Sequence, residues 1–585
     1  MSKSTRNLPL IIFAAILSFG MWQTLSAQSN RNIVSLNFDP KVDGFKFPNY
    51  KNEGNKWQDD LGDEDLGKMF GLESLCKKRD RNNQCIDKLD TAKWLDKYKK
   101  AMNIGHCEGI AVASLRMNSN LPFKGKSLPA QFQTGANSVY GLPRNQTLEN
   151  YIAYYWITQS FKEVSKPAQE TRLKGPVAIA KMLYDGIKNK KDTYLIELYK
   201  NDNGRPFDGH AVAPYAVEET ATQYIIYVYD NNFPGQARSL FIDKNDAQDW
   251  YYSAERNKDY MGNFESKTLE LTANSLRDNQ CFDPPWAFDS NQRTGCGRVA
   301  SILKSPVFTN ASYTNPLFSN LQDADGEDAE FFITGEGNML ITDNGRRLGY
   351  DENNQFYEEI RNGNFVFLIG GFGIDIPHFT LPYNPNGGDY VVEFSGRNLE
   401  AESQFDFVFS APGVRGGGGQ PEKPGFTVGF DNIRLDPNEI LTATVSRDGS
   451  TITFTTSGTD TETPEVYYAY DPQNGDEPSY FITIGGVELA EDKTLDYDID
   501  FEAGKLYLSD DDGDRDDYDI DLVRLKSDGT IQEYKQNDLK IGKTDKYEMD
   551  FGDWKGGEDT MCFKDDEDGD GVDDANCVEE PNEKP

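Results

Sequence analysis

The chain of 585 residues holds only three histidines and seven cysteines. Zinc sites are built from clusters of thiolate and imidazole ligands, and six of the cysteines fall into close pairs, so neither a zinc site nor a catalytic metal is expected. Basic residues are also scarce, with 60 Lys and Arg against 97 Asp and Glu and a net charge of −37. An excess of carboxylates repels phosphate backbones and anionic lipids, which argues against a nucleic-acid partner and a membrane-surface role.

Long apolar runs are scarce as well. The run from Leu8 to Phe19 is shorter than the ~20 residues that a membrane span needs. It follows Lys3 and Arg6 and precedes Leu25-Ser26-Ala27, a pattern typical of a signal peptide that is cut after a small residue. No cysteine follows the cut to carry a lipid. We therefore expect residues 1–27 to be a signal peptide and the protein to be secreted or held at the cell surface, without spanning the membrane.

Exported proteins keep disulfides, and close spacing favours short disulfide loops. The close pairs in this sequence are Cys76 with Cys85, Cys281 with Cys296, and Cys562 with Cys577. Cys107 is left over. It is therefore either a reactive thiol or a handle for an intermolecular bond.

The length allows about three or four domains. Residues 28 to about 100 are either a removable pro-segment or an extension of the first domain. Beyond residue 326 the pattern is almost purely β, as in the alternation of apolar and acidic residues from Leu495 to Phe501. The predicted division is a first α+β domain over 28–325, β-sandwich-type domains over 326–440 and 441–558, and an acidic tail over 559–585.

Local patterns in the first domain predict helices followed by strands. One helix starts at Cys107, directly after the turn residue Gly105, and another starts at Gly175-Pro176, where proline suits the first helical position. The period then changes to that of short strands rich in Val, Ile, Tyr and Ala. These strands are predicted over Tyr194 to Tyr199, Gly209 to Val217 and Tyr224 to Asp230.

A thiol at the positive end of a helix needs an imidazole partner to become a good nucleophile. His106 is the neighbouring residue and points elsewhere, and His378 lies in the β region as a surface or packing residue. His210 stands at the start of one predicted strand, and Asp230 ends the next. An antiparallel pair brings these ends together, so that the carboxylate orients the imidazole, with Asn231 or Asn232 as substitutes if the register shifts.

The segments Gly105-His106-Cys107-Glu108-Gly109-Ile110-Ala111, His210-Ala211-Val212 and Tyr229-Asp230-Asn231-Asn232 resemble the papain-like cysteine peptidase superfamily, more nearly its bacterial branch. The resemblance covers about residues 100–240. It implies an α+β papain-like fold with Cys107 as nucleophile, His210 as base and Asp230 as orienter. Members of the family usually carry a glutamine shortly before the cysteine that helps to bind the oxyanion. This chain lacks one there, and Asn103, together with the backbone N–H of Cys107, is the substitute that we consider.

The resemblance implies hydrolysis of a peptide or isopeptide bond through a thioester, with an extracellular protein or peptide as substrate. Two alternatives remain. A transglutaminase-like acyl transferase also uses Cys, His and Asp, but with a shorter interval between Cys and His. In the other alternative, the protein is a non-catalytic surface adhesin or carbohydrate-binding protein whose β domains contact the cell surface or glycans.

The acidic tail places carboxylates at alternating positions with glycine where a sharp turn is needed, which suits Ca²⁺. It resembles a thrombospondin type 3 repeat, and Cys562 and Cys577 bracket it. The expected ligands of this structural Ca²⁺ are Asp566, Asp568, Asp570, Asp573 and Asp574. A second run, Asp510 to Asp517, has similar spacing but contains Arg515 and no framing cysteines.

Overall fold

The computed structural model describes residues 32–52, 61–202, 205–255, 258–278, 282, 328–335, 337–371, 375–384, 386–397, 399–412, 425–458, 465–472, 476–486, 489, 491, 493–500, 503–510, 516–541, 546–552, 554, 561–565 and 574–578. The predicted signal peptide, Cys281 and Cys296 lie outside these residues. Within the described part of the chain, no helix is long and apolar enough to cross a membrane.

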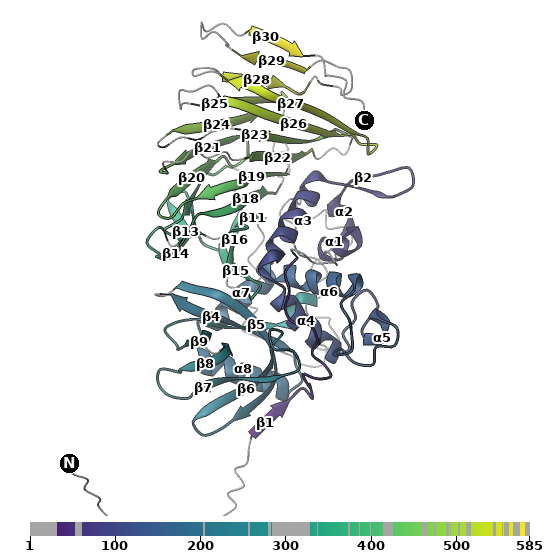
Figure 1. Ribbon diagram of the computed structural model, residues 1–585, viewed down its shortest axis with the longest axis vertical. Helices are drawn as coiled ribbons and strands as arrows, with labels where there is room; N and C mark the ends of the chain where they lie inside the picture. Colours follow the sequence, from purple (N-terminus) through teal and green to yellow (C-terminus); the bar gives the residue numbers. More distant parts are fainter. Residues whose placement is uncertain are drawn as a thin grey trace, which may run out of the picture.

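Helices come first along the chain, and antiparallel strands dominate after them (Figure 1). This confirms the coarse expectation of an α+β region followed by a mostly β body. The helices of the described residues are α1 (Asp63–Phe70), α2 (Leu72–Leu75), α3 (Leu89–Ala101), α4 (Cys107–Asn118), α5 (Pro129–Phe132), α6 (Gln146–Ile157), α7 (Lys162–Arg172) and α8 (Pro176–Lys188), with short 3-10 turns η1 (Met102–Ile104), η2 (Thr158–Ser160) and η3 (Asn274–Asp278).

The first body pairs these helices with an antiparallel sheet in the order β10-β4-β5-β6-β7-β8-β9, with β1 added beside β5. Helix α8 packs an apolar face, which includes Ile179 and Leu183, against this sheet and forms a core of its own there. The strands are β1 (Asn32–Ser35), β4 (Tyr194–Asp202), β5 (Arg205–Glu219), β6 (Gln223–Tyr229), β7 (Ala237–Asp243), β8 (Trp250–Glu255), β9 (Lys258–Gly262) and β10 (Leu269–Ala273). The predicted helices at Cys107 and Pro176 and the three predicted strands are confirmed.

The second body is a long stack of strands in two sheets, drawn from green to yellow in Figure 1. One sheet runs β15-β16-β11-β18-β19-β22-β23-β26-β27. Its strands are β11 (Asp328–Ile333), β15 (Asn364–Ile369), β16 (Asp375–Pro382), β18 (Ser403–Ala411), β19 (Gly425–Leu435), β22 (Glu465–Asp471), β23 (Ser479–Gly485), β26 (Asp516–Leu525) and β27 (Ile531–Ile541).

The other sheet runs β14-β13-β12-β17-β20-β21-β24-β25-β28-β29-β30. Its strands are β12 (Asn338–Asp343), β13 (Arg346–Tyr350), β14 (Phe356–Glu358), β17 (Tyr390–Ser395), β20 (Ile440–Val445), β21 (Thr451–Thr456), β24 (Thr494–Asp500), β25 (Lys505–Asp510), β28 (Lys546–Asp550), β29 (Met561–Asp565) and β30 (Asp574–Val578). In β24 the apolar residues predicted to face inward, Leu495, Tyr497 and Ile499, are buried.

The two sheets run on across residue 440, where we expected a boundary between two sandwich domains. In one sheet β17 pairs with β20, and in the other β19 pairs with β22. Both ladders join residues from the two sides of 440. Because each new hairpin adds to the edge left by the one before, the sheets lengthen without forming a second, separate core.

Helix α3 joins the two bodies. The Trp94 indole N–H and the Tyr98 hydroxyl both donate to the carboxylate of Glu330 in β11, at 3.0 and 2.7 Å. Lys97, which is buried, pairs with Asp431 of β19. Buried polar groups are costly unless they are paired, so these contacts fix one orientation of the helix on the sandwich.

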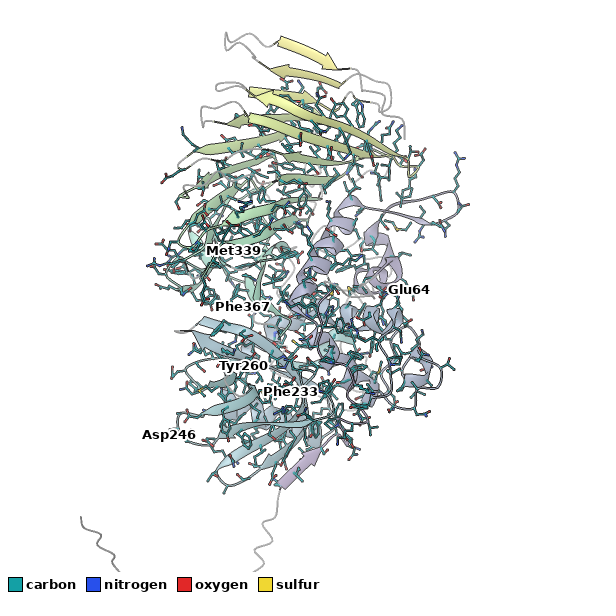
Figure 2. The ribbon with its side chains drawn as sticks, viewed as in Figure 1. Glu64, Phe233, Asp246, Tyr260, Met339 and Phe367 are labelled. Carbon is teal, nitrogen blue, oxygen red and sulfur yellow. A yellow bond between two sulfur atoms is a disulfide. The ribbon has the colours of Figure 1, made fainter. Side chains whose placement is uncertain are left out.

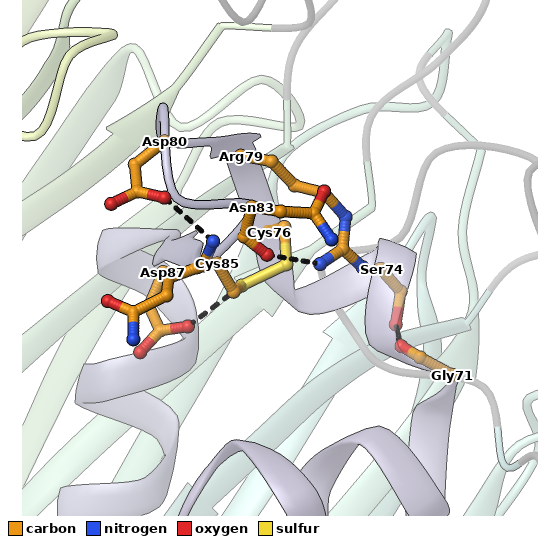
Figure 3. The surroundings of a disulfide bond; sticks show 9 residues. Gly71, Ser74, Cys76, Arg79, Asp80, Asn83, Cys85 and Asp87 are labelled. Carbon is orange, nitrogen blue, oxygen red and sulfur yellow. Dashed lines mark hydrogen bonds between the residues drawn. A yellow bond between two sulfur atoms is a disulfide. The ribbon is translucent and has the colours of Figure 1, made fainter.

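Disulfides were predicted at three places, and the structure describes the side chains of one pair and the backbone of a second. Cys76 and Cys85 form a disulfide that closes the hairpin of β2 (Cys76–Arg79) and β3 (Cys85–Asp87) (Figure 3). In the β29–β30 hairpin, Cys562 and Cys577 stand directly opposite each other in register. The Cys562–Cys577 bond stays a prediction.

Candidate active site

Cys107 is the first residue of α4 and is fully buried. It is a free cysteine within the described residues, as the sequence predicted. The side-chain amide of Asn231 donates to the Cys107 carbonyl oxygen at 2.8 Å and so ties the start of the helix to the end of β6. The first turn of a helix carries unpaired N–H groups and a partial positive charge, which favours a thiolate at this position.

His210 and Asp230 meet where β5 and β6 pair. The Nε2 atom of His210 lies 2.8 Å from Oδ1 of Asp230, and both side chains are buried. The carboxylate also accepts the backbone N–H of Asn232 at 2.7 Å and the hydroxyl of Tyr252. The predicted strand pairing therefore brings the carboxylate to the imidazole, and Nδ1 of His210 is left for a partner on the other side.

The three groups shift one another's proton affinity. Burial lowers the pKa of His210, but the Asp230 carboxylate and the Cys107 thiol outweigh it and raise this pKa to about 10. Burial raises the pKa of Cys107, and His210 only partly offsets the rise. Burial opposes ionisation of Asp230 too, yet His210 and Tyr252 hold the pKa of this carboxyl below its usual value. The imidazole is thus strongly stabilised as a cation beside a thiol that is shielded from water.

A pair of hydrogen-bond donors converges beside the thiol. The backbone N–H of Cys107 and Nδ2 of Asn49 both point at the carbonyl oxygen of Gly370, at 3.4 and 2.6 Å. The Asn49 side chain is fixed because its Oδ1 accepts the backbone N–H groups of His106 and Tyr50, at 2.8 and 3.0 Å. Two fixed donors on one oxygen form the arrangement that stabilises an oxyanion.

The side chain of Asn103, which we considered for this role, is exposed in η1. Asn49 comes from the segment after β1, which sequence reasoning treated as a pro-segment or an extension. No spacing or periodicity connects Asn49 with Cys107. The backbone N–H of Asn49 donates to the Asn231 carbonyl oxygen at 3.1 Å, and this long-range contact brings it to the site.

The other two histidines have structural partners. Nδ1 of His106 lies 2.8 Å from the carbonyl oxygen of Tyr50, and the two rings stack. Nε2 of His378 lies 2.6 Å from the Glu330 carboxylate in the buried contact under α3. His378 is therefore a packing residue, which is one of the two roles considered for it.

Buried ionisable groups continue behind the helix start. Glu108 pairs with Arg277 of η3, and the guanidinium also donates to the hydroxyl of Thr158 at 2.5 Å. Burial raises the pKa of Glu108 to about 8, even though Arg277 acts against the rise. Removing either partner would leave a buried charge unpaired, which is strongly destabilising. The pair therefore holds α4 in contact with η3.

The predicted calcium ligands are only partly described. Asp566, Asp568, Asp570 and Asp573 lie outside the described residues, and Asp574 begins β30. Where residues are described, no group of three or more His, Cys, Asp or Glu side chains is placed to hold a metal ion. Calcium binding by the tail stays a prediction.

Comparison with known proteins leaves the site to be judged on its own geometry. No protein-family model, no curated protein and no solved structure matches this chain.

Proposed function

We propose that the protein is an exported thiol hydrolase that cleaves peptide or isopeptide bonds, with Cys107 as nucleophile, His210 as general base and Asp230 as its orienter. One observation carries the proposal. A thiol at a helix start, an imidazole held by a carboxylate, and two donors fixed on one carbonyl oxygen all meet at a single buried point. A structural cysteine needs none of these partners.

The proposed reaction follows from the positions of these groups. Transfer of the thiol proton to Nδ1 of a neutral His210 gives a thiolate–imidazolium pair, which the Asp230 carboxylate stabilises, and the thiolate attacks the carbonyl carbon of the substrate. Asn49 Nδ2 and the Cys107 N–H hold the oxyanion that forms. The imidazolium then protonates the leaving amine. Water hydrolyses the thioester and restores the free thiol, so no metal or redox partner is consumed.

The test joins alkylation of the thiol with hydrolysis. Iodoacetamide is added at pH 6, and the modified residue and its rate are determined by peptide mass spectrometry, in the natural chain and in His210→Ala. A peptide library is incubated with the same proteins and with Cys107→Ala. We expect His210→Ala to slow alkylation of Cys107 and both variants to abolish peptide cleavage.

Equal alkylation rates in the natural chain and in His210→Ala would contradict the proposal, because an unassisted thiol does not depend on the imidazole. Cleavage that persists in Cys107→Ala would contradict it as well. Transfer of the acyl group to an added amine, in place of hydrolysis, would favour the transglutaminase-like alternative.

A further inference from the structure

The oxygen held by the two donors at the candidate site belongs to the protein itself. Gly370 and Gly371 directly follow strand β15, whose residues are all buried. This strand packs against β5, α7 and η2 of the first body. Figure 2 labels Phe367 of β15 where the sandwich meets the first body. The end of β15 therefore reaches from the second body into the reaction centre of the first.

Ile369, the residue before the two glycines, is bound through its backbone. Its N–H donates to Oε1 of Gln159 at 2.7 Å. Its carbonyl oxygen accepts from Nε1 of Trp156 at 2.9 Å and from Nε2 of Gln159 at 3.4 Å. These buried side chains contact the main chain of Ile369 on both its N–H and C=O groups, so the contacts do not depend on the side chain at this position.

The two glycines fit where no other residue does. A Cβ at Gly370 would lie 2.2 Å from the carbonyl oxygen of Ile104. Gly371 has φ of +85°, and a Cβ there would lie 2.8 Å from Nδ1 of His210 and 3.3 Å from Cβ of Cys107. The segment thus lies against both the imidazole and Cys107, where the scissile bond of a substrate has to lie.

After this point the chain does not continue as an extended peptide. The positive φ of Gly371 turns it back, and Asp375 pairs with Ile369 at the start of β16. The hydrogen bond from the Cys107 N–H to the Gly370 carbonyl oxygen is long, at 3.4 Å. A chain that reverses here, with β15 before it and β16 after it, is retained at the site, since it cannot adopt the straight path of a cleaved peptide.

We propose that residues 369–371, here called the occluding segment, are an intramolecular occupant of the substrate groove that keeps Cys107 inaccessible until it is displaced. This inference rests on the proposed function, because it takes the groove to be a substrate groove. A tethered segment acts at a high effective concentration, so it competes with peptides without being released. The apparent affinity for substrate is the intrinsic affinity multiplied by the fraction of molecules in which the segment is displaced from the site.

The experiment compares Cys107 alkylation by iodoacetamide in the full chain and in Gly371→Ala, with intact mass measured in parallel. We expect Gly371→Ala to raise the alkylation rate about tenfold or more, since the added Cβ meets the imidazole and strains the turn. Gly345→Ala is the matched control. Gly345 also has a positive φ, of +75°, but nothing lies within 4 Å of the added Cβ, so its alkylation rate should equal that of the natural chain.

Two further variants cover the case in which Gly371→Ala does not fold. Trp156→Phe and Gln159→Met each remove donors to Ile369 while keeping much of the packing volume, and both should raise the alkylation rate. Unchanged alkylation in every folded variant overturns the inference. So does a cut between Gly370 and Gly371 in the natural chain, because the segment is then a substrate. If the variants speed alkylation but no chain hydrolyses peptides, the occluding segment stands and the hydrolase proposal fails.

Discussion

The surroundings of Cys107 and the core of the sandwich bury different kinds of side chain. Around Cys107 the interior holds ionisable groups in close contact, including His210, Asp230 and the pair of Glu108 with Arg277. In the sandwich, stacked and edge-on aromatic rings such as Phe407, Phe430 and Phe454 fill much of the space between the sheets. Burying apolar rings stabilises a fold, whereas burying charges costs stability unless each has a partner. The comparison separates a region that concentrates paired ionisable groups from one that concentrates packed aromatic rings.

One hairpin belongs to both bodies. Strands β15 and β16 end the aromatic sandwich at one edge, and the turn between them carries Gly370 and Gly371 to the thiol. The packing of the sandwich edge therefore bears directly on the surroundings of Cys107. A change that loosens the sandwich edge is expected to expose Cys107 before it unfolds the first body.

The largest expected effect is in the sandwich core. The Phe430 ring is fully buried, 5.4 Å from Phe407 and 4.2 Å from Phe454 between centroids. Phe430→Ala should lower the free energy of unfolding by about 3–5 kcal/mol, through lost burial and the cavity left behind. Chemical denaturation measures it. Ile531→Ala, at an exposed position of β27, is the control and should change stability by no more than ~0.5 kcal/mol. Similar losses of stability in Phe430→Ala and Ile531→Ala would show that these aromatic rings do not form a packed core.

The second effect is on catalysis in the first body. Asn49→Asp keeps the oxygen that accepts the His106 and Tyr50 N–H groups but removes the donor to the oxyanion. We expect kcat for peptide hydrolysis to fall about 10²–10³-fold with a smaller change in KM. Asn103→Asp makes the same change of charge at an exposed side chain and should leave kcat unaltered. A fall in kcat in Asn103→Asp but not in Asn49→Asp would assign the oxyanion role to Asn103.

Removing the disulfide is expected to matter less. It links Cys76 and Cys85 across nine positions of sequence, so its loss should cost about 2–3 kcal/mol if the loop unfolds together with the body. The double variant Cys76→Ala with Cys85→Ala is compared with the natural chain by thermal denaturation. Since the β2–β3 hairpin lies outside both cores, we expect no change in Cys107 alkylation. Faster alkylation in the double variant would show that the β2–β3 hairpin controls access to Cys107.

The last expected effect is on the pH dependence of stability. The folded pKa of His210, at about 10, exceeds its ordinary value of 6.5, so its stabilising contribution is complete below pH 6.5 and is lost as the pH rises through 10. The lowered pKa of Asp230 adds stability above pH 3.8. The difference in Tm between the natural chain and His210→Gln should therefore be largest near pH 4–6.5 and shrink toward pH 10. A constant difference would mean that His210 is neutral in the folded protein.

Local sequence was enough to predict the parts of the site that lie on regular elements. The helix start at Cys107 and the pairing of the His210 strand with the strand that ends at Asp230 both follow from hydrophobic period and turn residues, and both are confirmed. Asn49 was missed because it lies in an irregular segment and is placed by one backbone contact to Asn231. Irregular segments carry no period that links them to a distant partner.

The boundary expected near residue 440 shows the same limit in the β region. Alternation correctly predicted which face of β24 is buried, since side-chain direction in a strand depends only on neighbouring positions. It does not tell which strand pairs with which. Strands on either side of residue 440 pair because their edges meet in space.

By itself, the sequence determined the unpaired thiol, the helix that presents it and the hairpin that carries the imidazole and carboxylate, because short-range spacing sets helices, strands and turns. Only the tertiary structure decided that Asn49 shares an oxygen with the Cys107 N–H and that Gly370 and Gly371 lie against Ile104, Cys107 and His210. Those contacts join residues far apart in the chain. They depend on how the two bodies pack, which no local pattern encodes.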